Sequence, residues 1–449
     1  MNKPLCVFQS PWATRSGYGD WADSIAKSLL RYGKYNLKLI PTRWGNCSKK
    51  NLMLDLDKNP ETQALIPCIL QQPLNQQPDV FIHCTIPSEF SPVGKFNIGM
   101  TAGIESTICT GPWLEKMNVM NFNIVTSTHS QKVFQAANFT KNHNDGRKEI
   151  VKLDKPCEVL FWGADTSIYR KTDEKNLHLE KFMSTIKENF AFLFVGQWTA
   201  NNMAADRKDI GMLIKTFIET FRGVSIDKRP CLILKTSGAA ICKIDKYECI
   251  SKLKSIIQSV GESPDNPEVY ILHGELTASE MNALYNHEKV KVHISFSHGE
   301  GYGMPLLEAS LSGKPLLAPN WSGHLDFLDP KLSKFLPIEL KQIPGEAVND
   351  WFLKESQWAV VNYQAASEIM KNVFNYYGAY LPNAEKLRTQ NEQKFSTQAM
   401  DKVFHEILDR VVPKFALQQT INLPKLRKIT LPKLNIPTNT IGQEETTKT

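Results

Sequence analysis

The chain has 449 residues, 42% of them hydrophobic and 22% charged, and its 53 lysines and arginines outnumber its 46 aspartates and glutamates. This length is too great for one ordinary hydrophobic core, so we expect two or three domains, and the composition excludes a fibrous or wholly disordered protein. Six basic residues against two glutamates follow from Pro413 onwards, which leaves the preceding residues with a net charge of only +3. The main part of the chain is therefore not a strongly basic, DNA-coating surface.

The sequence shows no sign of export or of a membrane span. Its start, MNKPLCVFQSPWATRSG, has only a short apolar run interrupted by serine and proline, unlike a signal peptide. No stretch reaches the roughly 18 uncharged apolar residues that a span requires. The nine cysteines form no C-x-x-C pair, which argues against a disulfide framework or a structural zinc site. We expect a cytoplasmic protein.

The first part of the chain alternates short apolar runs with a helical pattern. PLCVFQS predicts a strand, TRSGYG a glycine-bearing loop, and DWADSIAKSLLRYG a helix in which Trp21, Ile25 and Leu29 recur at helical spacing before Gly33 ends it. Further strands are predicted at YNLKLIP, DVFIHCT, KFNIGMT and NFNIVTS. Alternation of this kind is typical of α/β layers built on a parallel sheet.

A second series of strands and helices follows LFWGADTSIYR. The predicted strands are AFLFVGQW, PCLILKTSG, EVYILHG, VKVHISFS and PLLAP, and the predicted helices are IGMLIKTFIETFRG, a segment around residues 247–259, and TASEMNALYNHE. Thr277 and Glu280 form a capping box at the start of the last helix. The pattern predicts two doubly wound domains in tandem, with a junction near Gly163.

We expect the domain boundaries at residues 1–162 and 163–375, followed by a helical segment over residues 376–412 that packs back on the first domain. Residues 413–449 contain LPKLRKITLPKL, which repeats L-P-K-L and carries prolines that forbid a regular helix. We interpret this end as a flexible basic tail. The alternative is a short docking motif for a partner or for an acidic surface.

The stretch SHGEGYGMPLLEASLSGKP, over residues 297–315, connects a predicted strand to a predicted helix. Ligands bind at the carboxyl edge of parallel sheets, where such a loop lies. Gly301 and Gly303 allow close approach of a ligand, and the helix start offers free N–H groups to a diphosphate. Glu308 in the first turn suits ribose hydroxyls, and Glu300 the group beyond the phosphates. A purely structural turn is the alternative for the glycines alone.

These residues carry a family resemblance. EGYGMPLLEASLSGKPLLAPNWSGHLDFL resembles the E-G-F-G-L-P-x-x-E-A-x-x-x-G-x-P-V signature of the retaining GT-B glycosyltransferases, in particular family 4, the glycosyl transferases group 1. WGADTSIYR is similar to the interdomain N-G-V-D-x-x-x-F segment of that family, and FLFVGQW with DRKDIGMLIKTF is similar to V-G-R and R-K-G-x-x-x-L-I-x-A-F. The similarity covers most of residues 150–330, whereas the N-terminal part resembles the family only in layout.

The resemblance implies a GT-B fold, in which two doubly wound Rossmann-like domains face each other across a cleft. The first would bind the acceptor and the second a nucleoside diphosphate sugar, and transfer would keep the anomeric configuration. Glu308 would bind ribose, Glu300 would face the donor sugar, and Lys208 would neutralise the leaving diphosphate with a second basic residue. No cofactor and no metal is expected, because cations and N–H groups do that work. The expected donor-binding residues are Gly17, Gly19, Arg207, Lys208, Lys235, Gly301, Tyr302, Gly303, Met304 and Glu308.

Three departures from the family pattern leave alternatives open. Gln197 stands where V-G-R has arginine, and Asp209 follows R-K in place of glycine. The phosphate clamp would then combine Lys208 with Arg207, Lys235 or Arg15. The family histidine of the N-terminal domain has no counterpart in GMTAGIEST, so His83 or Glu105 would face the donor sugar with Lys208 and Glu300. For a lone histidine such as His83, however, the sequence favours a structural role.

The resemblance therefore implies a metal-independent glycosyltransferase acting on a saccharide, a lipid-linked molecule or another hydroxyl acceptor. The basic tail would provide a peripheral contact with a membrane or a partner. Three alternatives remain: transfer to a modified DNA base, for which no basic stripe with interleaved aromatics appears; a nucleotide-sugar epimerase of similar fold; and a non-catalytic scaffold that has lost turnover.

Overall fold

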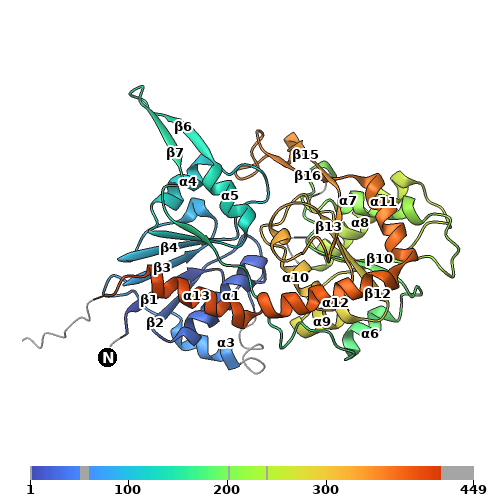
Figure 1. The fold of residues 1–449 in the computed structure, drawn as a ribbon, viewed down its shortest axis with the longest axis horizontal. Helices are drawn as coiled ribbons and strands as arrows, with labels where there is room; N and C mark the ends of the chain where they lie inside the picture. The colour runs from blue at the N-terminus through green and yellow to red at the C-terminus, as the bar shows by residue number, and fades with distance from the viewer. Residues whose placement is uncertain (1–2, 51–59, 201–202, 239–240, 416–449) are drawn as a thin grey trace, which may run out of the picture. The chain divides into compact units, whose positions relative to one another are not determined.

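The computed structural model describes residues 3–50, 60–200, 203–238 and 241–415, and the proposed tail of residues 413–449 lies almost wholly outside this part. Two six-stranded sheets organise the described chain (Figure 1). All paired strands within each sheet are parallel. The predicted α/β class with two doubly wound layers is confirmed.

The N-terminal sheet has the strand order β2-β1-β3-β4-β5-β8. Its strands are β1 (Leu5–Ser10), β2 (Asn36–Pro41), β3 (Val80–Cys84), β4 (Phe96–Thr101), β5 (Phe122–Val125) and β8 (Cys157–Val159). The helices that follow them are α1 (Gly17–Tyr32), α3 (Pro60–Leu65), α4 (Gly111–Asn118) and α5 (Thr128–Ala136). The order reverses between β1 and β3, which is the position where doubly wound sheets offer a ligand crevice.

The C-terminal sheet has the order β11-β10-β9-β12-β13-β14. Its strands are β9 (Ala191–Val195), β10 (Cys231–Lys235), β11 (Val269–Leu272), β12 (Val290–Ile294), β13 (Leu316–Pro319) and β14 (Lys334–Leu336). Its helices are α6 (Leu177–Met183), α7 (Ile210–Phe221), α8 (Lys243–Val260), α9 (Ala278–Asn286), α10 (Met304–Ser310) and α11 (Tyr363–Asn375). This is the Rossmann order, and its reversal lies between β9 and β12.

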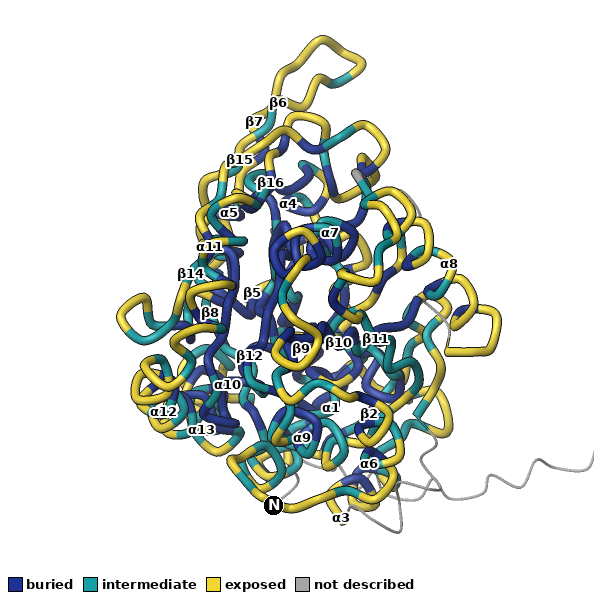
Figure 2. Tube along the Cα trace, turned by 90° about the vertical axis from the view of Figure 1, so that its right-hand side faces the viewer, coloured by how far each residue is buried: buried dark blue, intermediate teal, exposed yellow. Residues whose placement is uncertain are grey.

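Each sheet is buried on both faces, which explains why its strands read as continuous apolar runs. On the N-terminal sheet, α1 packs on one face, and α4 and α5 pack on the other. On the C-terminal sheet, α7, α8 and α11 cover one face, and α9 and α10 cover the other. Figure 2 shows the central strands β9, β10 and β12 as buried chain.

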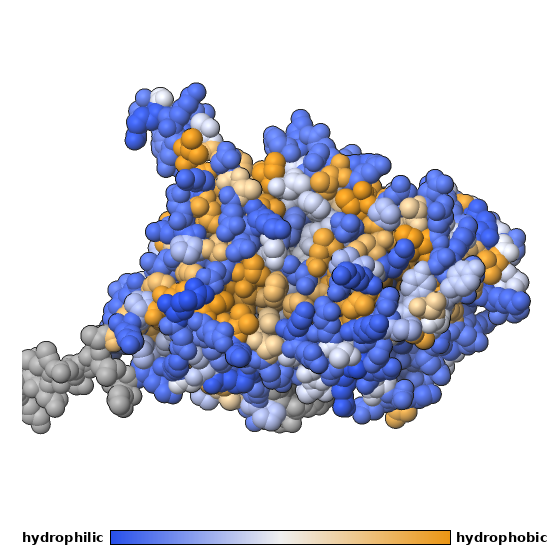
Figure 3. Space-filling model, viewed as in Figure 1, coloured by the Kyte–Doolittle hydropathy of each residue, from blue (hydrophilic) through white to orange (hydrophobic). Residues whose placement is uncertain are grey.

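Two hairpins lie outside these layers and have no counterpart in the sequence-based expectation. β6 (Asn138–Asn142) pairs with β7 (Lys148–Lys152), and β15 (Ile338–Gln342) pairs with β16 (Gln357–Val361), both antiparallel. The tip of the β6–β7 hairpin projects from its neighbours and is hydrophilic (Figure 3). The second hairpin carries a small core of its own that includes Phe352 and Trp358.

The helical segment after residue 375 contains α12 (Tyr377–Lys394) and α13 (Thr397–Val411). α12 packs against α10, whereas α13 packs against α1 and contributes Phe404, Ile407 and Leu408 to the N-terminal core. At the crossing, the N–H of Ala164 donates to Phe395 O, and the N–H of Thr397 donates to Ala164 O, both at 2.8 Å. The chain thus crosses from the first sheet to the second after β8 and returns to the first with α13, and the two crossings lie side by side.

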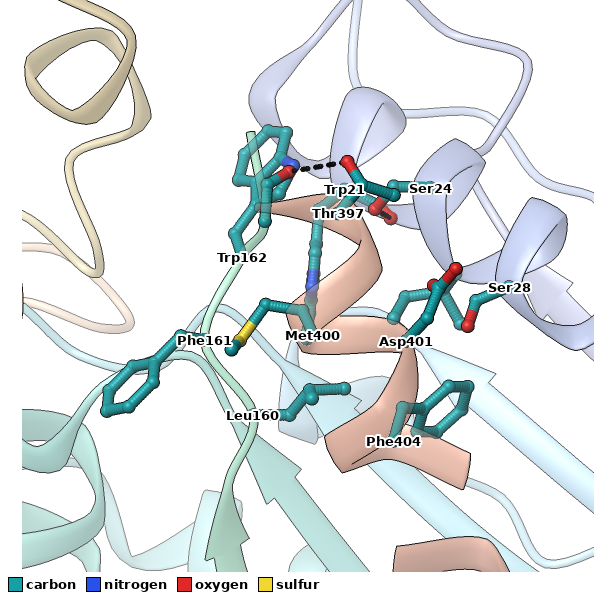
Figure 4. A pocket seen from close by; sticks show the side chains of 12 residues that line it. Trp21, Ser24, Ser28, Leu160, Phe161, Trp162, Thr397, Met400, Asp401 and Phe404 are labelled. Atoms are coloured by element: carbon teal, nitrogen blue, oxygen red, sulfur yellow. Dashed lines mark hydrogen bonds between the residues drawn. The ribbon is translucent and has the colours of Figure 1, made fainter. Parts of the chain in front are cut away.

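A cavity of about 20 Å³ lies at this crossing. Figure 4 shows it between α1, the segment of residues 160–163 and α13, with Trp21, Trp162 and Phe404 among its walls. The volume suffices for about one water molecule. Among the described helices, none combines the length and apolar character of a membrane span.

Candidate functional site

The central feature of the site is an ion pair at the strand-order reversal of the C-terminal sheet. Lys208 lies on the connection between β9 and α7, and Glu300 on the connection between β12 and α10. The Lys208 ammonium contacts Glu300 Oε1, and only 12% and 13% of the two side chains are exposed. β9 and β12 are the neighbours between which a doubly wound sheet opens toward its ligand. The two residues singled out by the sequence therefore meet where a ligand is expected.

The surroundings of the pair shift the pKa values of both its members. Burial would raise the pKa of Glu300, but the Lys208 ammonium and the Arg207 guanidinium lower it below its ordinary value. Burial, together with repulsion from Arg207, lowers the pKa of Lys208 despite the attraction of Glu300. We conclude that Glu300 is an ionised carboxylate at neutral pH.

A second ion pair links the site to the N-terminal sheet. Arg207 Nη1 lies 2.6 Å from Oε1 of Glu105, which belongs to the loop after β4. Trp321 Nε1 donates to Glu105 O at 2.9 Å, so the backbone of Glu105 is held by the C-terminal sheet as well. Glu105 Oε2 is buried and has no hydrogen-bond partner in the described chain. Glu105 is thus the predicted N-terminal residue that reaches the charged cluster.

His83 does not reach it. His83 is the last residue but one of β3, and its ring lies beside those of Phe81 and Phe90, with only 5% of the residue exposed. Burial lowers the pKa of His83 to about 4, although Glu89 opposes the shift, so the ring is neutral at pH 7. This environment matches the structural alternative rather than a residue that faces a donor sugar.

Two other predicted cations lie at the edge of the C-terminal sheet with partners of their own. Lys235 Nζ donates to Gly274 O at 2.7 Å, and burial lowers its pKa. Arg15 Nε lies 3.1 Å from Glu275 Oε2 in a half-exposed contact between the two sheets' loops. Neither side chain bonds to the Lys208–Glu300 pair, so Arg207 is the cation placed beside Lys208.

The glycine-rich connection around Glu300 is packed tightly against the N-terminal sheet. A Cβ atom added at Gly301 would lie 2.6 Å from Ala102 O, and Thr126 Oγ1 donates to Gly301 O at 3.3 Å. Gly303 has a φ of 96°, which excludes most other residues. Met304 then begins α10 half-buried. The predicted glycine loop therefore brings the two sheets together.

The structure corrects one expectation about this connection and places the side chain of a second predicted residue. Glu308 is the fifth residue of a seven-residue helix, not part of its first turn, because α10 begins only at Met304. The Tyr302 side chain lies in the core between Phe161 and Phe327, with 4% exposed, so it faces the apolar interior rather than a ligand. The alternation of the sequence does not reveal that the loop turns this ring inward.

Glu308 nevertheless has an unusual environment. Tyr285 donates its hydroxyl to Glu308 Oε2 at 3.0 Å. Burial raises the pKa of Glu308 to about 8, with Asp20 adding to the shift and the tyrosines Tyr285 and Tyr169 opposing it. The carboxyl is therefore protonated at neutral pH in the absence of a ligand, and it can both donate and accept hydrogen bonds.

The glycines near the N-terminus occupy a helix rather than the predicted loop. α1 starts at Gly17, and Ser16 caps it by accepting from the N–H of Gly19 at 2.9 Å. A Cβ atom at Gly19 would lie 2.1 Å from Thr14 O, so the turn before the helix requires glycine for packing. Gly17 has open space around it. The Ser-x-x-Gly spacing was a capping signal that the sequence-based interpretation did not use.

Several residues that support the site were not predicted. Asp206 accepts from the N–H of Ile210 at 2.8 Å and from that of Lys208 at 3.2 Å, so it caps α7 and orients the turn. His298 stacks on Trp358 at 4.1 Å and donates from Nδ1 to Ala359 O. The β15–β16 hairpin thereby holds the start of the glycine-rich connection. No local motif signals this contact, since 61 residues separate its partners.

The described residues contain no group of three or more His, Cys, Asp or Glu side chains arranged for a metal ion. The polar groups gathered at the site are two cations and two carboxylates. Such an arrangement offers N–H donors to anionic oxygens and carboxylate oxygens to hydroxyl groups.

Comparison with known proteins finds no matching family model and no matching curated sequence. Solved structures do match over nearly their whole length. HepE of Anabaena in complex with UDP-glucose is 15% identical, with 90% of this chain and 99% of that one covered and a TM-score of 0.58. A glycosyltransferase from Rickettsia africae is 13% identical, with 92% and 99% covered and a TM-score of 0.60. Sucrose-phosphate synthase from Thermosynechococcus elongatus is 9% identical, with 91% and 99% covered and a TM-score of 0.58.

The chain has the GT-B fold. The resemblance stated from the motifs around Glu300 is confirmed at that level. Because the identities are so low, the similarity establishes the shared architecture and leaves the chemistry to the residues of this chain.

Proposed function

We propose that the protein is a retaining glycosyltransferase that moves a sugar from a nucleoside diphosphate sugar to an acceptor hydroxyl without a metal ion. The observation that carries the proposal is the buried Lys208–Glu300 pair, with Arg207 beside it, at the strand-order reversal of the C-terminal sheet. The similarity to HepE of Anabaena supports it, because that protein has been solved in complex with UDP and with UDP-glucose.

The diphosphate would be bound by the cations of this cluster. Lys208 and Arg207 each contact a carboxylate in the unliganded site, so their charges are already directed into one place. An entering diphosphate would exchange for these carboxylates as the partner of the two cations. Glu300 and Glu105 would then be free to accept hydrogen bonds from the hydroxyls of the donor sugar.

In the transfer step, the acceptor oxygen forms a bond to the anomeric carbon while the bond from that carbon to the phosphate oxygen breaks. The diphosphate leaves with the electron pair, and the acceptor proton passes to the departing phosphate oxygen on the same face of the sugar. Lys208 and Arg207 stabilise the negative charge that develops on that oxygen. The hydrogen bond from Trp321 Nε1 to Glu105 O, which does not involve the carboxylate, would keep the acceptor domain against the donor.

Glu308 provides the first test. We expect UDP, GDP or ADP, alone or as its sugar conjugate, to raise the melting temperature of the wild-type protein. Glu308→Ala should abolish that shift, because the ribose hydroxyls would lose the carboxyl group that bonds to them. Glu188→Ala is the matched control, since Glu188 also accepts from a tyrosine, Tyr270, at 3.0 Å but precedes β9 at the other edge of the sheet.

The outcomes separate the candidate functions. A shift that persists in Glu308→Ala contradicts the ribose role of Glu308. No shift with any nucleotide contradicts both the transferase and the epimerase, and favours a non-catalytic scaffold. Where a donor binds, incubation without acceptor distinguishes the two enzymes, since an epimerase releases nucleotide and an altered sugar. Saccharides, lipid-linked acceptors and modified DNA are then screened as acceptors with the donor that binds.

A further inference from the structure

Backbone strain marks both sides of the Lys208–Glu300 pair. In the described chain, Asp209 and Ser322 are the non-glycine residues with positive φ, at 51° and 75°. Asp209 directly follows Lys208 and has a ψ of 37°, which is the left-handed conformation that aspartate tolerates. Ser322 has a ψ of −151°, a combination open almost only to glycine. The strain at Ser322 therefore requires an explanation.

The hydroxyl of Ser322 supplies one. The N–H of Glu300 donates to Ser322 Oγ at 2.8 Å, and the N–H of Gly323 donates to Glu300 O at 3.0 Å. Two consecutive residues thus hold both backbone groups of Glu300, and Ser322 is only 4% exposed. Glycine would remove the strain at position 322, but it has no hydroxyl to accept this hydrogen bond. Serine in a glycine conformation is what keeps Glu300 fixed.

The opposite side of the pair is fixed in a comparable way. Tyr363 donates its hydroxyl to Asp209 Oδ2 at 2.7 Å, and Asp206 Oδ1 accepts from the N–H of Lys208 at 3.2 Å. The backbones that carry the ammonium and the carboxylate are thus each held by buried polar side chains. A binding site that acts by orientation needs this kind of support.

We propose that Ser322 is a positioning residue for donor binding, which holds Glu300 so that its carboxylate meets the sugar of a nucleotide sugar. This proposal rests on the proposed function. It assigns the sugar, rather than the diphosphate, as the part of the donor that depends on Ser322, because the hydroxyl supports Glu300 and does not contact Lys208 or Arg207.

The test compares Ser322→Gly and Ser322→Ala with the wild type, using UDP and UDP-glucose, or the corresponding ADP or GDP pair if that nucleotide binds better. Glycine relieves the strain and alanine keeps it, whereas both lack the hydroxyl. We expect both variants to bind UDP within about two-fold of wild type and UDP-glucose about five- to ten-fold more weakly, the effect of one lost hydrogen bond. Stability should rise or stay equal in Ser322→Gly and fall in Ser322→Ala.

Ser312→Ala is the matched control. Ser312 is 2% exposed and donates to Ala309 O at 2.7 Å beyond the end of α10, away from Glu300. This variant should lose some stability and keep the affinities of wild type for both ligands. This control shows whether a loss of stability alone can weaken the binding of UDP-glucose without weakening that of UDP, as we expect for the Ser322 variants.

Three results would overturn the proposal. Unchanged binding of UDP-glucose by Ser322→Gly would show that the hydroxyl is dispensable for the donor. Equal losses for UDP and UDP-glucose, together with lower stability of the glycine variant, would reveal a purely structural serine. If the wild type itself binds neither nucleotides nor nucleotide sugars, the proposed function fails, and the role of Ser322 in donor binding fails with it.

Discussion

The carboxyl edges of the two sheets differ in what their predicted residues do. At the edge of the C-terminal sheet, Lys208 and Glu300 come from adjacent connections and meet in a buried ion pair. At the edge of the N-terminal sheet, His83 is enclosed by aromatic rings, and Glu105 alone of the predicted residues there contacts the cluster. Motifs with fixed spacing located the first edge, whereas a general α/β layout could not locate the second.

Lys208 gives the strongest test of the difference between the carboxyl edges of the two sheets. Lys208→Met should reduce donor turnover by about 100- to 1000-fold, the usual effect of removing one group that stabilises a leaving charge. It should also destabilise the fold by about 3 kcal/mol, because Glu300 would remain buried without its partner. Release of nucleoside diphosphate and denaturation in urea measure the two effects.

Lys314→Met is the control for this variant. Lys314 is a half-buried lysine that donates to His287 O at 2.7 Å before β13, far from the strand-order reversal. Its loss should reduce stability and leave turnover per folded molecule unchanged. A Lys208→Met protein that keeps more than about a third of wild-type turnover would show that the buried pair serves folding alone.

Glu105 tests whether the N-terminal edge takes part. Glu105→Gln removes the charge that engages Arg207, so free UDP should bind up to about five-fold more tightly, as expected from a half-exposed ion pair worth about 1 kcal/mol. Isothermal titration of wild type and variant measures the difference. Glu275→Gln, which releases Arg15 from its own pair, shows whether that cation contributes equally. Identical UDP affinity in Glu105→Gln and wild type would show that Arg207 does not bind the phosphates.

The smallest effect is expected at His83. His83→Leu should keep turnover within about two-fold of wild type, since the ring contacts only core residues. The lowered folded pKa, about 4 against 6.5 for the free side chain, means that the unfolded chain binds the proton first on acidification. His83 therefore costs stability as the pH falls from about 6.5 to 4, and the variant should lose less over that range in urea unfolding. A ten-fold loss of turnover in His83→Leu would show that His83 takes part in the reaction.

The fold was largely predictable, because both sheets are buried on both faces and their strands form uninterrupted apolar runs. The capping box at Thr277 and the strand before Ser297 were also correct. The β6–β7 hairpin was missed, because its two strands are mostly exposed and lack the pattern of a buried strand. The helix at Gly17 was placed too late, since the two glycines were interpreted as a loop rather than as the start of a capped helix.

Residues of the site could be predicted where a motif specifies them. They could not be predicted where packing between distant segments decides the direction of a side chain. Glu300 and Lys208 were found from spacing, but the inward turn of Tyr302 depends on Phe161 and Phe327, which are remote in sequence. Ser322 lies in the segment that resembles the family signature, but only its backbone conformation and its hydrogen bond reveal what its hydroxyl does. Sequence patterns thus identify which groups are present, and three-dimensional packing decides which of them point at a ligand.

The return of α13 to the first sheet has a consequence for synthesis of the chain. Phe404, Ile407 and Leu408 complete a core whose other members lie mostly within the first 125 residues. The ribosome completes the N-terminal sheet with β8, which ends at Val159, long before it reaches α13, which begins at Thr397 and covers this face. Until α13 is synthesised, the apolar surface of α1 that it covers stays exposed to solvent. We therefore expect chaperones that bind exposed apolar segments to bind the nascent chain at this surface.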